Sequence, residues 1–195
     1  DPVEVLPKAA VENILSYLRG SQLIQLSLIN KKWYNFIANS PVCMNKIRIH
    51  ITDYFLCQKR ALAVEDVDRI FDGGRKYQHI SLACIESILN EPAQFSREHK
   101  ILMGCFKWKT ISLCNHLFEN EMEFINFLGI VEPFVEKLEL RSVKIQEFIG
   151  VCETNFSFPH LTSLHLVNVS NFIYKEPFKN VFRLKEFCVA TEPFL

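Results

Sequence analysis

The chain has 195 residues, with 22 basic and 22 acidic side chains and a formal net charge of zero. Hydrophobic residues make up 49% and charged residues 23%, which is typical of a globular domain and argues against disorder, collagen and coiled coils. Without a basic excess, nucleic acid is not an expected partner. The longest stretch free of charged residues, 154–174, contains Thr, Ser, Asn, His and Pro throughout, so we expect no membrane-spanning helix.

The first forty residues predict two helices. After Leu6-Pro7, four apolar residues recur at helical spacing: Val11, Ile14, Leu15 and Leu18. Proline is tolerated at the first helical position, and Gly20 is expected to end the helix before Ser21 caps the next one. The second helix is predicted to present one apolar side, formed by Leu23, Leu26, Ile29 and Trp33. Ser40-Pro41 then breaks the chain.

The ordered string LPKAAVENILSYLRGSQLIQLSLINKKWYNFIANSP resembles the F-box, a motif of substrate receptors in cullin-RING ubiquitin ligases. The resemblance includes the opening Leu-Pro, Ile-Leu-x-x-Leu in the first helix, Leu-x-x-Leu in the second and the segment Ile29–Trp33. It implies a three-helix module over residues 1–46 that docks the Skp adaptor and, through it, a cullin. The implied adaptor contacts are Leu6, Pro7, Val11, Ile14, Leu15, Leu18, Leu26 and Trp33.

The sequence departs from the F-box pattern at two positions. Ala9 stands where the family often has an acid, and Met44 where it often has a tryptophan. Because methionine fills apolar gaps adaptably, we expect adaptor binding to be weakened and not abolished. Some of the implied contact residues must also hold the module together, and the sequence does not separate the two roles.

Residues 47–195 contain a repeated apolar-x-apolar pattern, which is typical of strands. It recurs six times: Ile47-Arg48-Ile49, Ile80-Ser81-Leu82, Ile111-Ser112-Leu113, Leu138-Glu139-Leu140, Leu164-His165-Leu166 and Phe187-Cys188-Val189. The last residues of these triplets are separated by 33, 31, 27, 26 and 23 positions. Helix-like patterns lie between them, for example Phe124, Phe127, Leu128 and Val131 after an acidic stretch.

This spacing is similar to that of leucine-rich repeats, which place a strand and a return helix every 20–29 residues. The Asn or Cys that normally follows the second Leu by three residues is missing, so the turn after each strand must satisfy its backbone groups differently. We therefore expect an α/β fold, with the F-box followed by an irregular solenoid of about six parallel strand units. The alternative is an ordinary α/β sheet with crossover helices. The last triplet ends six residues before Leu195, and because solenoids need a polar cap, we expect the intact protein to continue.

In such a solenoid the middle residue of each triplet faces the concave side of the sheet, because side chains alternate across a strand. Concave sheet faces are the usual binding surface of solenoids. The candidate substrate-facing residues are Arg48, His79, Ser81, Ser112, Glu139, Arg141, His165 and Cys188. They are mixed in charge, so they suit a protein or polar ligand, and an ordinary solvated face remains the alternative.

No residues are arranged for catalysis, cofactor binding or metal binding. The seven cysteines are odd in number and widely spaced, and the six histidines never pair at metal or triad spacing, so neither disulfides nor zinc are expected. Lys107-Trp108-Lys109 is predicted to be a half-buried edge, and Glu119, Glu121 and Glu123 a solvated first turn of a helix. The cysteines are expected to be free thiols and no secretory signal is visible in the given sequence, so we expect a cytoplasmic or nuclear protein.

We therefore interpret the sequence as a non-catalytic substrate receptor of an SCF-type ubiquitin ligase. Its partners would be the Skp adaptor, a cullin bound through that adaptor and an unknown protein target. Two alternatives stay open. The F-box-like segment could be only a structural cap on a repeat scaffold, which would bury the Leu6-Pro7 corner against the first repeat. The chain could also be a small α/β enzyme, which would require a deep pocket with converging polar side chains.

Overall fold

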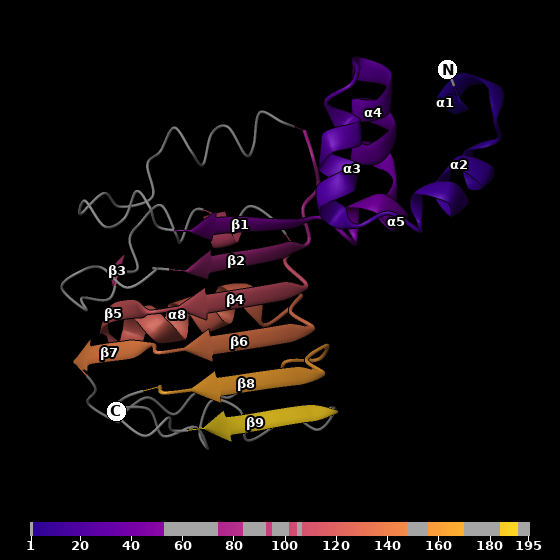
Figure 1. The fold of residues 1–195 in the computed structure, drawn as a ribbon. Helices are drawn as coiled ribbons and strands as arrows, with labels where there is room; N and C mark the ends of the chain where they lie inside the picture. Colours follow the sequence, from indigo (N-terminus) through magenta and orange to yellow (C-terminus); the bar gives the residue numbers. More distant parts are fainter. Residues whose placement is uncertain are drawn as a thin grey trace.

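The computed structural model describes residues 2–52, 74–83, 93–94, 102–104, 107–147, 156–169 and 184–190. Within these residues, an N-terminal group of helices is followed by strands arranged in two parallel sheets. The helices lie beside the start of the first strand, at one corner of the larger sheet (Figure 1). The fold is thus mixed α/β, as the sequence predicts.

The helical module contains five short helices. They are α1 (Pro2–Val5), α2 (Lys8–Leu15), α3 (Gly20–Ser27), α4 (Lys31–Asn39) and α5 (Pro41–Met44). One side of each longer helix is apolar, and these sides meet in a small core. Its buried residues are Val11, Leu15, Leu23, Ile37, Cys43, Met44 and Ile47.

The predicted second helix is in fact two helices. α3 ends at Ser27, and α4 begins after Asn30, whose side-chain oxygen accepts hydrogen bonds from the backbone N–H groups of Lys32 and Trp33 at 2.9 Å. Asparagine is among the best N-caps because its oxygen satisfies N–H groups that lack an intrahelical partner. Ile29 therefore lies in an exposed turn and not on the apolar side of a helix.

Gly20 has a different role from the predicted one. The first helix ends at Leu15, and Gly20 is the first residue of α3, preceded by Arg19 as the N-cap. A Cβ at Gly20 would overlap the carbonyl oxygen of Lys46, so glycine allows the two backbone segments to approach closely. Lys46 also donates from its ammonium group to the carbonyls of Ser16 and Leu18, which ties the end of the module to the end of α2.

The larger sheet contains six parallel strands, and each pairs with the next one along the chain. They are β1 (Arg48–Thr52), β2 (His79–Ala83), β4 (Thr110–Cys114), β6 (Lys137–Arg141), β8 (Ser163–Val167) and β9 (Glu186–Ala190). Every predicted apolar-x-apolar triplet reaches one of these strands, but the first is misaligned by two residues. Ile49 pairs with Ile80, so the strand core of β1 is Ile49-His50-Ile51, whereas Ile47 belongs to the helical module.

A second, smaller sheet was not predicted. It contains β3 (Ala93–Gln94), β5 (His116–Asn120) and β7 (Lys144–Glu147), again parallel. A turn that includes a residue with positive φ, Asn115 (59°) or Ser142 (51°), leads from a strand of the large sheet to one of the small sheet. Asn168 (52°) follows β8 in the same way. These turns satisfy the backbone without the usual side-chain ladder, because each positive-φ residue donates its N–H to the carbonyl that ends the neighbouring strand, at 2.7–2.9 Å.

The main core lies between the two sheets and helix α8 (Glu121–Val131), which runs behind the large sheet (Figure 1). Phe118 of β5 packs against Phe124 and Phe127 of α8, with ring centroids 5.0 and 5.6 Å apart. Trp108 is buried and not half-buried, and its indole donates to the carbonyl of Leu102 at 3.0 Å. Glu121 is also buried, contrary to the predicted solvated turn.

Two residues of the segment 74–78 join the helical module to the sheets. Arg75 is buried and donates a hydrogen bond to Ser27 of α3 at 2.5 Å, while its guanidinium lies 4.6 Å from the ring centroid of Tyr34 in α4. Tyr77 packs against both the helical core and the main core. Neither residue is predictable from the sequence, because both lie outside any periodic pattern.

Replacing Arg75 with alanine is expected to lower the free energy of unfolding by about 2 kcal/mol, because a desolvated cation–π contact and a charged hydrogen bond are lost together. Urea denaturation followed by circular dichroism measures this change. Lys76→Ala is the matched control, since Lys76 is the exposed neighbour and should change stability by less than about 0.5 kcal/mol. Equal stability of the Arg75→Ala variant and the parent would show that Arg75 does not hold the module to the sheets.

Candidate functional site

The helical module exposes seven large apolar side chains. We call these residues the apolar surface of the module: Val5, Leu6, Ile14, Tyr17, Leu28, Ile29 and Val42. The most exposed is Tyr17, at 82%. Exposed apolar residues that gather on one small unit are typical of a protein-binding site.

Polar contacts hold the segments that carry this surface. Lys32 at the start of α4 forms an ion pair with Glu4 of α1, which connects α1 to the start of α4. Exposed ion pairs contribute little to stability, so this contact orients α1 more than it stabilises the fold. The hydrogen bond from Lys32 and its positive charge lower the pKa of the exposed Glu4 carboxyl.

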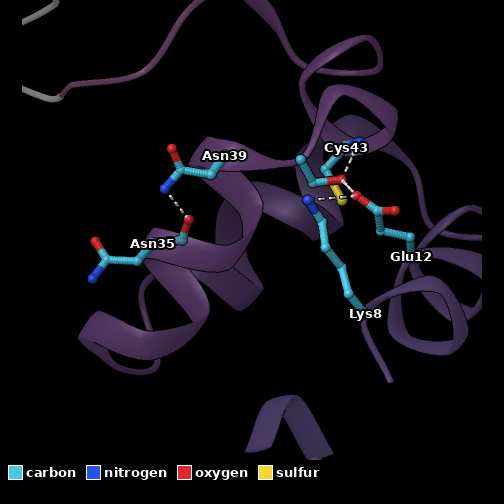
Figure 2. Close-up of polar contacts among 6 residues, drawn as sticks. Lys8, Glu12, Asn35, Asn39 and Cys43 are labelled. Atoms are coloured by element: carbon cyan, nitrogen blue, oxygen red, sulfur yellow. Dashed lines mark hydrogen bonds and ion pairs between the residues drawn. The ribbon is translucent and has the colours of Figure 1, made fainter. Parts of the chain in front are cut away.

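A second group of contacts fixes α2 against the start of α5 (Figure 2). Ser40 is fully buried; its hydroxyl donates to Glu12 at 2.7 Å and accepts from the backbone N–H of Cys43 at 3.4 Å. Lys8 lies 3.9 Å from the same Glu12 oxygen. Burial raises the pKa of the Cys43 thiol, which keeps it protonated and disfavours a nucleophilic role.

The eight residues implied as adaptor contacts fall into three groups. Leu6, Pro7 and Ile14 are exposed, and therefore available to a partner. Leu18, Leu26 and Trp33 are half-buried at the edge of the module's core. Val11 and Leu15 are 2% exposed, so their side chains belong to the core and present almost no area to a partner.

Five residues of the apolar surface are not among the implied adaptor contacts: Val5, Tyr17, Leu28, Ile29 and Val42. The helix break could have revealed Leu28, because Asn30 followed by a new helix is a recognisable start signal. The two departures from the F-box pattern lie in different environments. Met44 is buried in the core of the module, so this departure affects packing. Ala9 is exposed on α2, so only this departure can affect a contact with a partner.

The large sheet presents the second candidate surface, its open face. In the observed register one column of this face contains His50, Ser81, Ser112, Glu139, His165 and Cys188. Arg48 was predicted for this column, but it pairs with His79 and therefore lies two residues further back along the strand, in the neighbouring column of the same face. That neighbouring column continues through Thr110, Lys137, Ser163 and Glu186.

Several charges on the open face are already paired with one another. Glu139 accepts hydrogen bonds from Ser112 at 3.2 Å and from Arg141 at 3.3 Å. His165 lies 3.9 Å from Glu186 across the sheet. Arg141 and Arg48 are the two arginines of the predicted set. Because Arg141 already donates to Glu139, it is less suited to bind a ligand.

His79 links the open face to the helical module. One ring nitrogen lies 2.9 Å from the hydroxyl of Thr110 in β4, and the other lies 3.2 Å from the side-chain oxygen of Asn45, just after α5. Burial lowers the pKa of His79, and the positive charges of Arg48 and Lys109 lower it further, against a smaller opposite effect of Glu136. The neutral imidazole is therefore the form that the fold favours.

This pKa shift predicts that the fold loses stability in mild acid. Because the folded pKa lies below the unfolded value, the unfolded chain binds more protons, and stability falls as the pH drops from the unfolded value of about 6.5 through the folded pKa. Urea midpoints at pH 7.5 and 5.0 measure the loss, which should be smaller in a His79→Gln variant. His160→Gln is the control, since His160 is exposed. An undiminished acid loss in His79→Gln would contradict the assignment.

The described residues contain neither a metal-binding cluster nor a disulfide. No three His, Cys, Asp or Glu side chains among them are grouped so that they could hold an ion, and Cys43, Cys114 and Cys188 are free. The other cysteines, Cys57, Cys84, Cys105 and Cys152, lie outside the described residues. No helix in this part of the chain is long and apolar enough to cross a membrane.

Comparison with known families identifies the helical module. Residues 4–45 match the family model of the F-box domain, a range that runs from α1 through α5. Comparison of the chain with curated proteins and with solved structures gives no match. The F-box match therefore covers the helices with the exposed apolar surface, and it does not extend to the sheets.

Proposed function

We propose that this chain is the target-recognition subunit of an SCF-type cullin-RING ubiquitin ligase. F-box domains bind the Skp adaptor in these complexes, so the module would dock the adaptor and, through it, a cullin. The sheet domain would bind the protein that is to be ubiquitinated. The chain would place the target and supply no bond-making groups, which suits an intracellular role in the cytoplasm, the nucleus or both.

The exposed apolar surface carries this proposal. A module whose own core is complete has no structural need to keep Leu6, Ile14, Tyr17 and Leu28 in water, and each exposed side chain forgoes the favourable burial of apolar area. Adaptor binding would supply that burial. The residues Leu6, Pro7 and Ile14 combine exposure with the F-box pattern and are the strongest candidates for contact.

The arrangement of the module argues against a purely structural cap. A cap would bury the Leu6-Pro7 corner against the first strand unit. Instead, the described contacts to the sheet domain come from Ser27, Tyr34 and Asn45, while Leu6 is 39% exposed and Pro7 is exposed. None of these described contacts to the sheet domain comes from the Leu6-Pro7 corner.

We also propose that residues 47–195 form a divergent leucine-rich-repeat domain. Three observations support it: large-sheet strands that pair in chain order, a strand spacing that shortens from 31 to 23 residues in the observed register, and a recurrent turn after the strand. Each such unit buries its apolar side only by stacking on its neighbours. The binding face of the domain would be the open face of the large sheet.

The mechanism of such a receptor is positional. Holding a target on the same rigid body as the adaptor raises its effective concentration near the ubiquitin-charged enzyme. Arg75 and Tyr77 serve this mechanism because they fix the module relative to the sheets.

Co-elution tests the proposal. The purified chain is mixed with purified Skp adaptor and then with cullin, and the mixtures are separated by size-exclusion chromatography. We expect a one-to-one complex with the adaptor and a larger complex when cullin is added. A folded chain that elutes apart from the adaptor at micromolar concentrations would contradict the receptor function and favour a repeat scaffold.

A further inference from the structure

We propose that the open face binds an acidic segment of the target along the start of strands β1 to β6. This inference rests on the proposed function, because it names the kind of target that the sheet domain would hold. The surface involved, the strand-start row, contains Arg48, His79, Thr110 and Lys137, which are cross-strand neighbours on β1, β2, β4 and β6.

Both ends of the strand-start row are cationic side chains. Arg48 and Lys137 are both exposed, and neither forms an ion pair within the described parts of the chain. Lys109, just before the row, lies 3.0 Å from Glu136, so its charge is locally balanced. In a chain of zero net charge, two unpaired cations on the same face of a sheet make a site that attracts anions.

The direction of the His79 pKa shift agrees with this placement of charge. In the row His79 lies between the two cations, and its pKa is lowered first by burial and then by the positive charge of Arg48, with Lys109 adding to it and the hydrogen bond with Asn45 and the charge of Glu136 opposing it. The ring therefore lies in a positive local potential. A bound carboxylate would lie in the same potential.

The spacing of the row defines its ligand. Arg48 and Lys137 are three strand intervals apart, or about 14 Å at about 4.8 Å per interval. An extended peptide rises about 3.3 Å per residue, and its side chains alternate between two sides. Two acidic residues at positions i and i+4 would thus point the same way at about 13 Å and meet both cations, with the peptide running across the strands.

Neighbouring groups limit the site to this half of the sheet. Beyond Lys137 the column continues with Ser163 and ends at Glu186, whose carboxylate would repel an acidic segment. Glu139 lies in the adjacent column and already accepts a hydrogen bond from Arg141, which lies one column further along the strands. The strand-start row also begins at the F-box module, because His79 contacts Asn45 at 3.2 Å, so a bound segment would lie directly beside the module.

A peptide titration tests the inference with the full chain. The probe is a fluorescein-labelled Gly/Ser peptide with glutamates at its second and sixth positions, and binding is followed by fluorescence anisotropy at 50 mM salt. We expect saturable binding that weakens as salt rises, and at least ten-fold weaker binding to an Arg48→Glu, Lys137→Glu variant. Lys144→Glu is the matched control, since Lys144 lies on β7 of the other sheet, and should bind within two-fold of the parent.

Further peptides identify the source of the negative charge. A peptide with phosphoserines at the same two positions also presents two negative charges. Comparison of its affinity with that of the glutamate peptide shows whether the site prefers carboxylate or phosphate. Moving the second glutamate to the seventh position should weaken binding, because the two side chains then point to opposite sides. Absence of binding by both peptides, or equal binding to the charge-reversed variant, would overturn the inference. Tighter binding of a short single-stranded DNA than of either peptide would also overturn it.

The charge-reversed variant separates this inference from the proposed function. Circular dichroism of the charge-reversed variant shows whether it is folded. The Arg48→Gln, Lys137→Gln variant removes the same two charges without adding negative ones, so loss of peptide binding in this variant too is not caused by a folding defect from charge reversal. Adaptor co-elution should be unchanged in both variants. Failed peptide binding with intact adaptor binding refutes only the acidic-segment inference, whereas failed adaptor binding with intact peptide binding refutes the receptor function.

Discussion

Replacing Phe118 with alanine is expected to lower the free energy of unfolding by about 3–5 kcal/mol. Phe118 is 0% exposed and meets Phe124 edge-on at 5.0 Å and Phe127 at 5.6 Å. The substitution removes these contacts and leaves a cavity that the two sheets and α8 can close only partly. Because small domains are typically stable by about 5–15 kcal/mol, this one change would remove a large share of the stability.

Urea denaturation at 25 °C measures this effect, with Leu117→Ala as the matched control. Leu117 is the preceding residue of β5 and is only half-buried, on the opposite side of the strand, so its loss should cost less than about 1.5 kcal/mol. A loss below 1 kcal/mol for Phe118→Ala, with an unchanged denaturant dependence, would show that the small sheet and α8 do not share a core with the large sheet.

Replacing Ile14 with aspartate is expected to weaken adaptor binding at least 30-fold while the chain stays folded. Ile14 is 56% exposed on α2, so the new carboxylate remains in water in the free chain. On docking it would be buried in an apolar interface without a partner, which costs several kcal/mol. Truncation of a central contact alone typically costs about 2 kcal/mol or more, which corresponds to roughly 30-fold in affinity.

Titration calorimetry with the purified adaptor measures the change in affinity. Asn13→Asp is the control, since it places the same charge one residue away, on another side of α2, and should bind within about three-fold of the parent. Circular dichroism confirms that both variants are folded. Parent-like affinity of Ile14→Asp would place the adaptor contact elsewhere on the module.

The fold was predictable from the sequence wherever one periodic pattern determines a structure. The apolar-x-apolar triplets located the strands of the large sheet, because alternation is the direct sequence signature of a strand with one buried face. The first triplet was misaligned since Ile47, Ile49 and Ile51 continue the alternation across the boundary, and local pattern cannot show that Ile47 packs against helices. Only the tertiary contact decides the register.

The parts that could not be predicted depend on contacts between distant residues. The strands β5 and β7 are short, and a single turn separates each from a strand of the large sheet, so their sequences read as a continuation or as the start of a helix. Gly20 looked like a helix terminator, whereas its role is set by the approach of Lys46, 26 residues later. The F-box pattern indicates which residues of the module are candidate adaptor contacts. Only the structure shows that Ile14 is exposed whereas Val11 is buried in the core.

Hydrogen–deuterium exchange of the full chain with and without the Skp adaptor tests whether the helical module is the adaptor-binding surface. We expect the adaptor to slow exchange within residues 4–45, most clearly around Leu6, Ile14 and the turn at Leu28, and to leave exchange in β4, β6 and β8 unchanged. Protection of the sheet strands in place of the module, or no protection anywhere at saturating adaptor, would show that the module does not dock the adaptor.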